Sequence, residues 1–136
     1  MFASGIQQNL QARHYLRGDF GGESEPHSHP YRVELICRTP GLDANGFSVD
    51  IDLLESALAH VLGRIDEVLL NELPYFLTRQ PSLENLCLYI FDHVLAYLKS
   101  DDAREDSLPH EIEIRIWESA TAWASFSGSS SEEPRV

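Results

Sequence analysis

Residues 27–37, HSHPYRVELIC, alternate polar and apolar side chains from Tyr31 to Cys37. Because successive side chains of a β-strand point to opposite faces of a sheet, this period of two predicts a half-buried strand. His27 and His29 share the parity of the apolar residues, so both imidazoles are expected on the buried face. The stretch therefore predicts a sheet that carries two histidines in line with its core residues.

Three further segments are expected to be strands. Residues 6–16 alternate in the same way, and His14 has the parity of their apolar side chains. A segment that begins at Glu111 has isoleucine at every second position, which is typical of a strand with one buried face. Residues 123–126 can form a fourth strand.

Two amphipathic helices are expected between the second and third strands. Asp50 can cap the first, which ends near Gly63, and Ser82 can cap the second, which runs to Lys99. The order strand, strand, helix, helix, strand, strand predicts an α+β fold. We expect an antiparallel four-stranded sheet with both helices on one face.

The length of 136 residues fits one compact domain. Hydrophobic residues make up 43% of the chain and charged residues 24%, so a core can form. We expect a single domain over residues 1–126 and a disordered tail over residues 127–136, which are small, polar and charged. Cys37 and Cys87 lie in apolar patterns and are expected to be reduced core residues.

The charge and hydropathy of the chain argue against two classes of partner. With 22 acidic and 10 basic side chains the net charge is −12, and such a surface repels nucleic acid at long range. No apolar run approaches the ~20 residues of a membrane-spanning helix, and the chain does not begin with a basic segment followed by an apolar one. A cytoplasmic protein that binds neither nucleic acid nor membranes is the expectation.

Three histidines are expected to converge on one metal ion. His27 and His29 project from one strand with attachment points ~7 Å apart, and pairing of the first two strands would add His14. Three neutral imidazoles that bind Zn²⁺ leave one coordination position open, as in catalytic zinc sites. The alternative is a chance His-x-His on the surface, since the chain has six histidines.

Three carboxylates could act with such a metal. Glu118 has the parity of the isoleucines before it, and a carboxylate buried there would suit a ligand with two adjacent N–H groups. Alternatively, Glu118 ends the strand and faces solvent. Glu23 and Glu25 lie in a glycine-containing loop just before the histidine pair. Either could be a general base beside a metal, or both belong to a solvated acidic loop.

The chain resembles the 6-pyruvoyl-tetrahydropterin synthase and 6-carboxytetrahydropterin synthase family in six ordered segments between about residues 6 and 126. These include the strand around His14, the histidine stretch that opens this section, and residues 42–50, 65–71, 81–86 and 117–124. The resemblance implies a tunnelling fold, in which the sheets of neighbouring subunits join into a barrel. It also implies a homohexamer built from two trimers, with sites at subunit interfaces.

The resemblance assigns roles to particular residues. It implies that Zn²⁺ is bound by three side chains, namely His14, His27 and His29. The ion holds the side-chain hydroxyls of 7,8-dihydroneopterin triphosphate, and Glu118 anchors the pterin ring. Ser82 and Glu84 match a segment near the pterin.

Two positions depart from the family pattern. Members usually carry a cysteine base in the loop before His-x-His, where this chain has Glu23, and an Asp-His pair where it has Asp66-Glu67. A related branch has glutamate in place of the cysteine and cleaves the side chain by a retro-aldol reaction, which gives 6-hydroxymethyl-dihydropterin.

The expected function is therefore a zinc-dependent lyase that acts on a dihydropterin side chain. Glu23 would be the base, and Asp66 and Glu67 would relay protons. A catalytically silent paralogue that keeps the zinc and pterin pockets is the first alternative. A metal-free interaction protein is the second.

Overall fold

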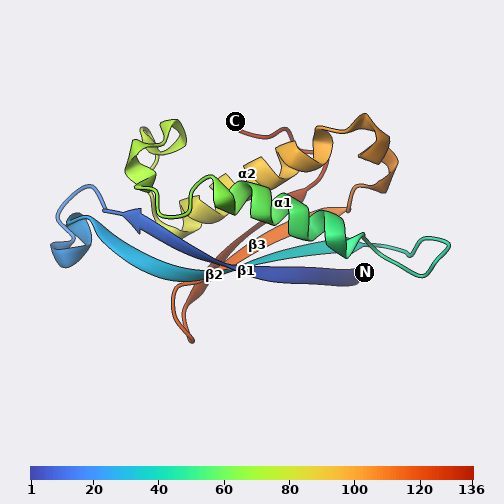
Figure 1. Cartoon of the computed structure of the whole chain (residues 1–136), viewed down its shortest axis with the longest axis horizontal. Coiled ribbons are helices and arrows are strands. Elements are labelled where there is room, and N and C mark those ends of the chain that lie inside the picture. The colour runs from blue at the N-terminus through green and yellow to red at the C-terminus, as the bar shows by residue number, and fades with distance from the viewer.

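Four strands form one antiparallel sheet in the order β1-β2-β3-β4, and two helices cover one face of it (Figure 1). The computed structural model describes residues 1–136. The strands are β1 (Phe2–His14), β2 (His27–Thr39), β3 (Glu111–Trp117) and β4 (Trp123–Ser129), and the helices are α1 (Ile51–Gly63) and α2 (Leu83–Lys99). The predicted element order and the α+β class are confirmed.

The long β1–β2 hairpin has the predicted parity. In its register Leu10 faces Tyr31 and His14 faces His27, so the apolar side chains and the histidines lie on the face that the helices cover. Both strands have 13 residues and are longer than the alternation predicted. β1 begins at Phe2 because backbone pairing continues to Thr39, beyond the alternating segment.

Both helices begin at the predicted caps. The side chain of Asp50 accepts a hydrogen bond from Asp52 N, and that of Ser82 accepts one from Asn85 N, which satisfies free N–H groups of each first turn. Between helices and sheet lies a core of 26 buried hydrophobic residues. Cys37 and Cys87 belong to this core as free thiols. Neither helix is long and apolar enough to cross a bilayer.

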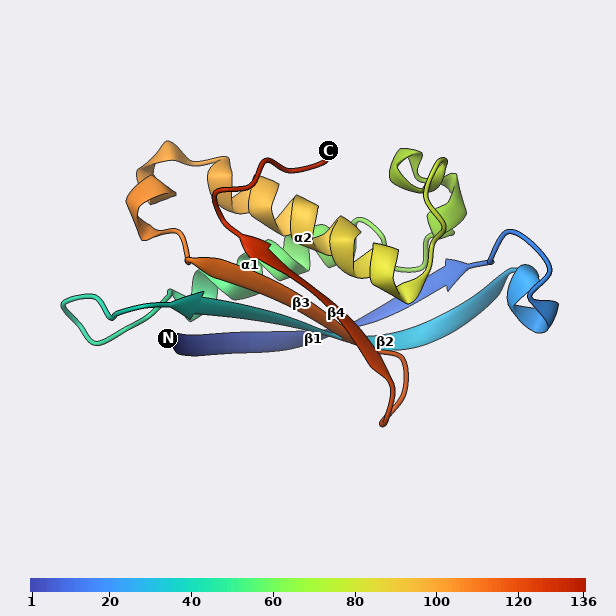
Figure 2. The same cartoon turned by 180° about the vertical axis from the view of Figure 1, so that it is seen from behind.

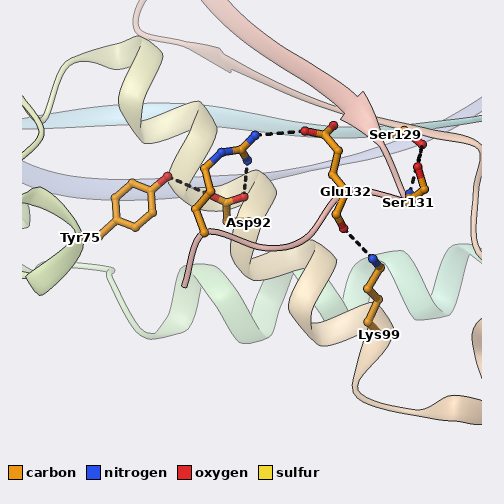
Figure 3. Close-up of polar contacts among 7 residues, drawn as sticks. Tyr75, Asp92, Lys99, Ser129, Ser131 and Glu132 are labelled. Carbon is orange, nitrogen blue, oxygen red and sulfur yellow. Dashed lines mark hydrogen bonds and ion pairs between the residues drawn. The ribbon is translucent and has the colours of Figure 1, made fainter.

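The C-terminal residues run back along α2 after β4 (Figure 2). Lys99 Nζ donates to the Glu132 carbonyl at 2.6 Å, and Arg135 Nη1 lies 2.6 Å from Asp92 Oδ1 (Figure 3). Arg135 also donates to Glu132 Oε1, and Tyr75 OH donates to Asp92 Oδ2. We call Tyr75, Asp92, Glu132 and Arg135 the C-terminal clasp.

The clasp lies within residues 127–136, the segment for which we expect a disordered tail. Residues 127–129 continue β4, and the residues after them contact α2 through the Arg135–Asp92 ion pair and the hydrogen bond from Lys99 to the Glu132 carbonyl. Composition suggested disorder because the segment is small and polar, but one arginine reaches the fully buried carboxylate of Asp92.

Candidate functional site

The end of the β1–β2 hairpin gathers the three predicted histidines. Pairing places His14 directly opposite His27, and His29 follows two residues later on the same face. The ring centroids are 4.5 Å apart for His14 and His27, 4.6 Å for His27 and His29, and 5.5 Å for His14 and His29. One carboxylate joins them, because the ligand atoms of the three histidines and Glu23 all lie within 4.8 Å of one another. We call these four residues the hairpin cluster.

Backbone carbonyls orient two of the rings. His14 Nδ1 lies 2.7 Å from the Pro81 carbonyl, and His27 Nδ1 lies 2.7 Å from the Glu25 carbonyl. A carbonyl only accepts hydrogen bonds, so each Nδ1 carries the proton and each Nε2 presents a lone pair. Both Nε2 atoms are buried and have no hydrogen-bond partner.

Such orphaned nitrogens are rare in folded proteins, and a bound metal ion would account for them. Burial lowers the pKa of the His14 imidazole, although the hydrogen bond to Pro81 and the charge of Glu23 oppose this shift. The neutral form, which a metal requires, is thereby favoured. The hairpin cluster therefore fits a metal ion by its donor set and by its unsatisfied atoms.

Glu23 approaches the histidines from the loop between β1 and β2. Its Oε2 atom lies 3.0 Å from His27 Nε2, and its side chain is 52% exposed. Glu25, the other candidate base, contributes its backbone carbonyl to His27, and its carboxylate is not part of the cluster. The structure thus brings Glu23, rather than the Glu25 carboxylate, to the predicted metal ligands.

Glu118 does not continue the buried row of isoleucines in β3. The strand ends at Trp117, and the chain turns so that Glu118 N donates to the Ala122 carbonyl at 3.0 Å. The residue is exposed, which agrees with the alternative that Glu118 ends the strand and faces solvent. It lines an open cavity of about 670 Å³ together with Tyr31 and Asp66.

Asp66 and Glu67 lie along the outer edge of β1 and bond to it. Gln11 N donates to Asp66 Oδ1 at 2.9 Å, and Glu67 N donates to the Gln11 carbonyl at 2.7 Å. Glu67 is the one non-glycine residue with a positive φ, +63°. Within a single chain neither carboxylate belongs to the hairpin cluster, and Asp66 instead shares the cavity of Glu118.

Ser82 and Glu84 lie in the first turn of α2, where Ser82 acts as the cap. The segment reaches the hairpin cluster through the carbonyl of Pro81, the residue before this cap. Sequence reasoning missed Pro81, because a backbone carbonyl leaves no signal in residue type.

Tyr31 was also not predicted as a site residue. It is 4% exposed, its ring centroid lies 5.7 Å from that of His29, and it lines the cavity of Glu118. Burial raises the pKa of the Tyr31 hydroxyl, and the charges of Glu118 and Glu23 reinforce this shift. The sequence did contain a signal for Tyr31: it lies at an even number of positions from His27 and His29, so all three side chains share one face of β2. Tyr31 therefore connects the hairpin cluster with the cavity.

Comparison with known proteins gives one family. A sequence model of the family described as 6-pyruvoyl tetrahydropterin synthase matches residues 5–129. The 6-pyruvoyl tetrahydrobiopterin synthase of Drosophila melanogaster is 31% identical over 92 residues, which are 66% of this chain and 55% of the fly protein. The match thus spans about half the length of that curated relative.

Solved structures share the fold. The 6-pyruvoyl tetrahydropterin synthase of Caenorhabditis elegans superposes with a TM-score of 0.77 at 19% identity, and 94% of this chain and 96% of the worm chain are covered. The Plasmodium falciparum protein gives 0.72 at 17% identity, with 93% and 98% covered. The Plasmodium vivax protein gives 0.74 at 14% identity, with 95% and 99% covered, and a variant with a catalytic glutamate replaced by alanine is also known.

These likenesses confirm the tunnelling-fold topology of the subunit, and the family match covers nearly the whole chain. The hairpin cluster and the cavity of Glu118 lie within the matched residues. The chain belongs to the 6-pyruvoyl tetrahydropterin synthase family.

Proposed function

We propose that the protein is a zinc-dependent lyase acting on the side chain of 7,8-dihydroneopterin triphosphate or a related dihydropterin. Family membership supports a pterin lyase-type function. The observation that carries the proposal is the hairpin cluster, with two buried imidazole nitrogens that lack partners. A bound zinc ion would make the hydroxyls of a substrate side chain more acidic.

Each residue of the hairpin cluster has its own proposed role. His14, His27 and His29 hold the ion, and the carbonyls of Pro81 and Glu25 keep the first two rings in the required tautomer. Glu23 accepts a proton from the substrate side chain, as a retro-aldol cleavage requires. The half-exposed position of its carboxylate supports this role. So does the Plasmodium vivax protein, in which a glutamate is described as a catalytic residue.

The pterin ring is bound at some distance from the ion. Glu118 accepts two adjacent N–H groups of the ring, and its exposed position beside a cavity supports this assignment. Asp66 lines the same cavity, and Asp66 and Glu67 relay protons. Ser82 and Glu84 lie near the ring. Fixing the ring orients the side chain toward Glu23, and orientation contributes strongly to rate.

We further propose a cytoplasmic homohexamer of two trimers with sites completed between subunits. β1 and β4 are the edge strands of the sheet. Residues 66–68 bond to the edge of β1 at Gln11 and Arg13, and the rest of that edge and β4 support pairing with neighbouring subunits. The separation of Asp66 and Glu67 from the hairpin cluster also supports a site assembled from two subunits. The buried free thiols of Cys37 and Cys87 support a reducing compartment.

A catalytically silent paralogue is the second candidate. The residues that favour it are Glu23 and Glu67, which stand where the family usually has the cysteine and histidine of its proton relay. Such a protein would keep the metal and bind a pterin without converting it.

The zinc-loaded protein is incubated with dihydroneopterin and with its triphosphate, and the products are separated by chromatography. We expect turnover that Glu23→Gln abolishes and Glu25→Gln retains, because Glu25 supplies only its backbone carbonyl. Measurable pterin binding with unchanged substrate would replace the lyase by the silent paralogue. Absence of zinc from the purified protein would overturn the metal-dependent mechanism.

A further inference from the structure

We propose that the Glu23 carboxylate is an exchangeable fourth metal ligand, which binds the ion while the site lacks substrate and is displaced when substrate binds. This inference rests on the proposed zinc site but goes beyond the role of Glu23 as a base. It makes the availability of the base depend on the arrival of the substrate.

The donor set is the first observation. The ligand oxygen of Glu23 lies within 4.8 Å of the ligand nitrogens of His14, His27 and His29. Two ligands of one zinc ion can lie up to roughly 4 Å apart, given metal–ligand distances of about 2.0–2.2 Å. Small side-chain movements would therefore close all four donors around one ion. Three imidazoles and a carboxylate would complete a tetrahedral site.

The contact between Glu23 and His27 is the second observation. Nδ1 of His27 donates to the Glu25 carbonyl, so Nε2 presents its lone pair. A carboxylate oxygen of Glu23 faces this nitrogen at 3.0 Å, yet His27 Nε2 forms no hydrogen bond. Two electron-pair donors at this distance repel each other unless a proton or a metal ion lies between them. Because the ligand nitrogens of His14 and His29 lie within 4.8 Å of the same carboxylate oxygen, the geometry points to a shared metal ion.

The loop backbone is the third observation. Leu16 N donates to the Glu23 carbonyl at 2.7 Å, and Ser24 Oγ donates to the Gly18 carbonyl and accepts from Phe20 N. The backbone of the loop is therefore fixed by hydrogen bonds. The carboxylate stands on a half-exposed side chain, so rotation about side-chain bonds is enough to move it.

These three observations give the exchange a simple physical route. A carboxylate oxygen bound to the ion would have its lone pair engaged with the metal and could not accept a substrate proton. Substrate oxygens would compete for the same coordination position, and the released carboxylate would then lie next to the substrate protons. Glu23 would thus be free to act as a base only when a substrate is in place.

The test compares metal binding by the wild-type protein, Glu23→Gln and Asp19→Asn. Asp19 lies in the same loop, is exposed and loses the same charge, but does not belong to the hairpin cluster. Zinc affinity is measured by competition with a chromophoric chelator, and the Co²⁺ form is followed by its d–d absorption. We expect Glu23→Gln to weaken zinc binding about tenfold to a hundredfold and to change the Co²⁺ spectrum. Asp19→Asn should match the wild type.

Oxidised neopterin serves as a substrate analogue in the same experiment. It should change the Co²⁺ spectrum of the wild type markedly and that of Glu23→Gln much less, since no carboxylate is left to displace. Unchanged zinc affinity and spectrum in Glu23→Gln would overturn the inference, even if turnover is lost. Conversely, an absence of turnover with an intact effect on zinc binding would count against the proposed lyase and not against the exchangeable ligand.

Discussion

The hairpin cluster and the C-terminal clasp both take polar side chains out of water, but they treat them differently. Asp92 in the clasp is fully buried, and each of its oxygens has a donor, Tyr75 OH at 2.8 Å and Arg135 Nη1 at 2.6 Å (Figure 3). His14 in the hairpin cluster is 7% exposed, and its Nε2 atom has no partner. The buried groups of one region are satisfied, and those of the other are not.

This difference teaches how to separate structure from function in a single chain. A buried polar group without a partner costs about 1–3 kcal/mol, so folded proteins rarely keep one without a reason. The buried carboxylate of the clasp has its hydrogen-bond donors without any ligand, so we interpret the clasp as a contact that stabilises the fold. The hairpin cluster becomes complete only when something binds, and this predicts that mutations in the two regions affect different measurements.

The largest effect is expected for His14→Ala. Loss of one imidazole should lower zinc affinity more than about a hundredfold, beyond the cost of losing an outer-shell partner, and should abolish turnover. Zinc content by elemental analysis and chelator competition measure this. His110→Ala is the control, because His110 is exposed and outside the cluster. Full zinc occupancy in His14→Ala would contradict the interpretation of the hairpin cluster as a metal site.

Arg135→Met is expected to have a smaller effect, on the stability of the fold and not on metal binding. The substitution leaves the Asp92 carboxylate buried with Tyr75 as its one donor, which should lower the free energy of unfolding by about 2–4 kcal/mol. Urea denaturation measures the change. Zinc affinity should stay at the wild-type value, because the clasp shares no residue with the hairpin cluster.

The double variant Asp92→Leu/Arg135→Met sharpens this result. Replacing both members of a buried ion pair by apolar side chains is often nearly neutral, so the double variant should recover part of the lost stability. If Arg135→Met instead weakened zinc binding as much as it weakened folding, the two regions could not be treated as separate.

A third prediction concerns Glu113, another buried carboxylate with hydrogen-bond partners, on the opposite face of the sheet. Glu113 is buried between Arg38 Nη2 at 2.9 Å and Arg115 Nη2 at 2.8 Å. Burial alone would raise the pKa of the Glu113 carboxyl, but the hydrogen bonds from Arg115 and Arg38 outweigh it and hold the pKa below its usual range. A carboxyl with a lowered pKa stabilises the fold above the unfolded-state value of 4.5, and this contribution is lost as the pH falls through the folded-state value.

Glu113→Gln should therefore lower stability at pH 7 by about 1–2 kcal/mol and flatten the loss of stability below pH 4.5. Urea titrations between neutral and acidic pH test this. Glu111→Gln, on the same strand and without an ion pair, is the control. An unchanged acid slope in Glu113→Gln would show that the two arginines do not set the behaviour of this carboxyl.

The convergence of the histidines could be predicted because it depends on periodicity alone. A period of two determines which side chains share a face, and pairing of adjacent strands brings His14 to His27. The carbonyls that orient these rings could not be predicted, since Pro81 and Glu25 act through backbone atoms.

Local patterns do not report distant contacts. Strand parity left two positions open for Glu118, and the structure agrees with the one in which the strand ends at Trp117 and the chain turns. Composition suggests disorder in the tail, but it cannot show that Arg135 pairs with a carboxylate 43 positions away. No short window of sequence contains both residues of that ion pair.

The smallest effect on the free energy of unfolding is expected at Glu67, where the backbone is strained. Glu67 has a φ of +63°, a conformation that costs an L-residue about 1–2 kcal/mol, and Gln11 holds the segment in place. Glu67→Gly removes this strain but gains entropy in the unfolded chain, so we expect a net stabilisation of about 0.5–1 kcal/mol by urea denaturation. Because the proposed relay uses the carboxylate, turnover should fall as stability rises. Glu67→Gln, which keeps the side-chain size and the strain, should reduce turnover without the stabilisation. If Glu67→Gly were stabilising and fully active, the strained backbone would be a feature of folding alone, and the relay would have to be assigned to Asp66 without Glu67.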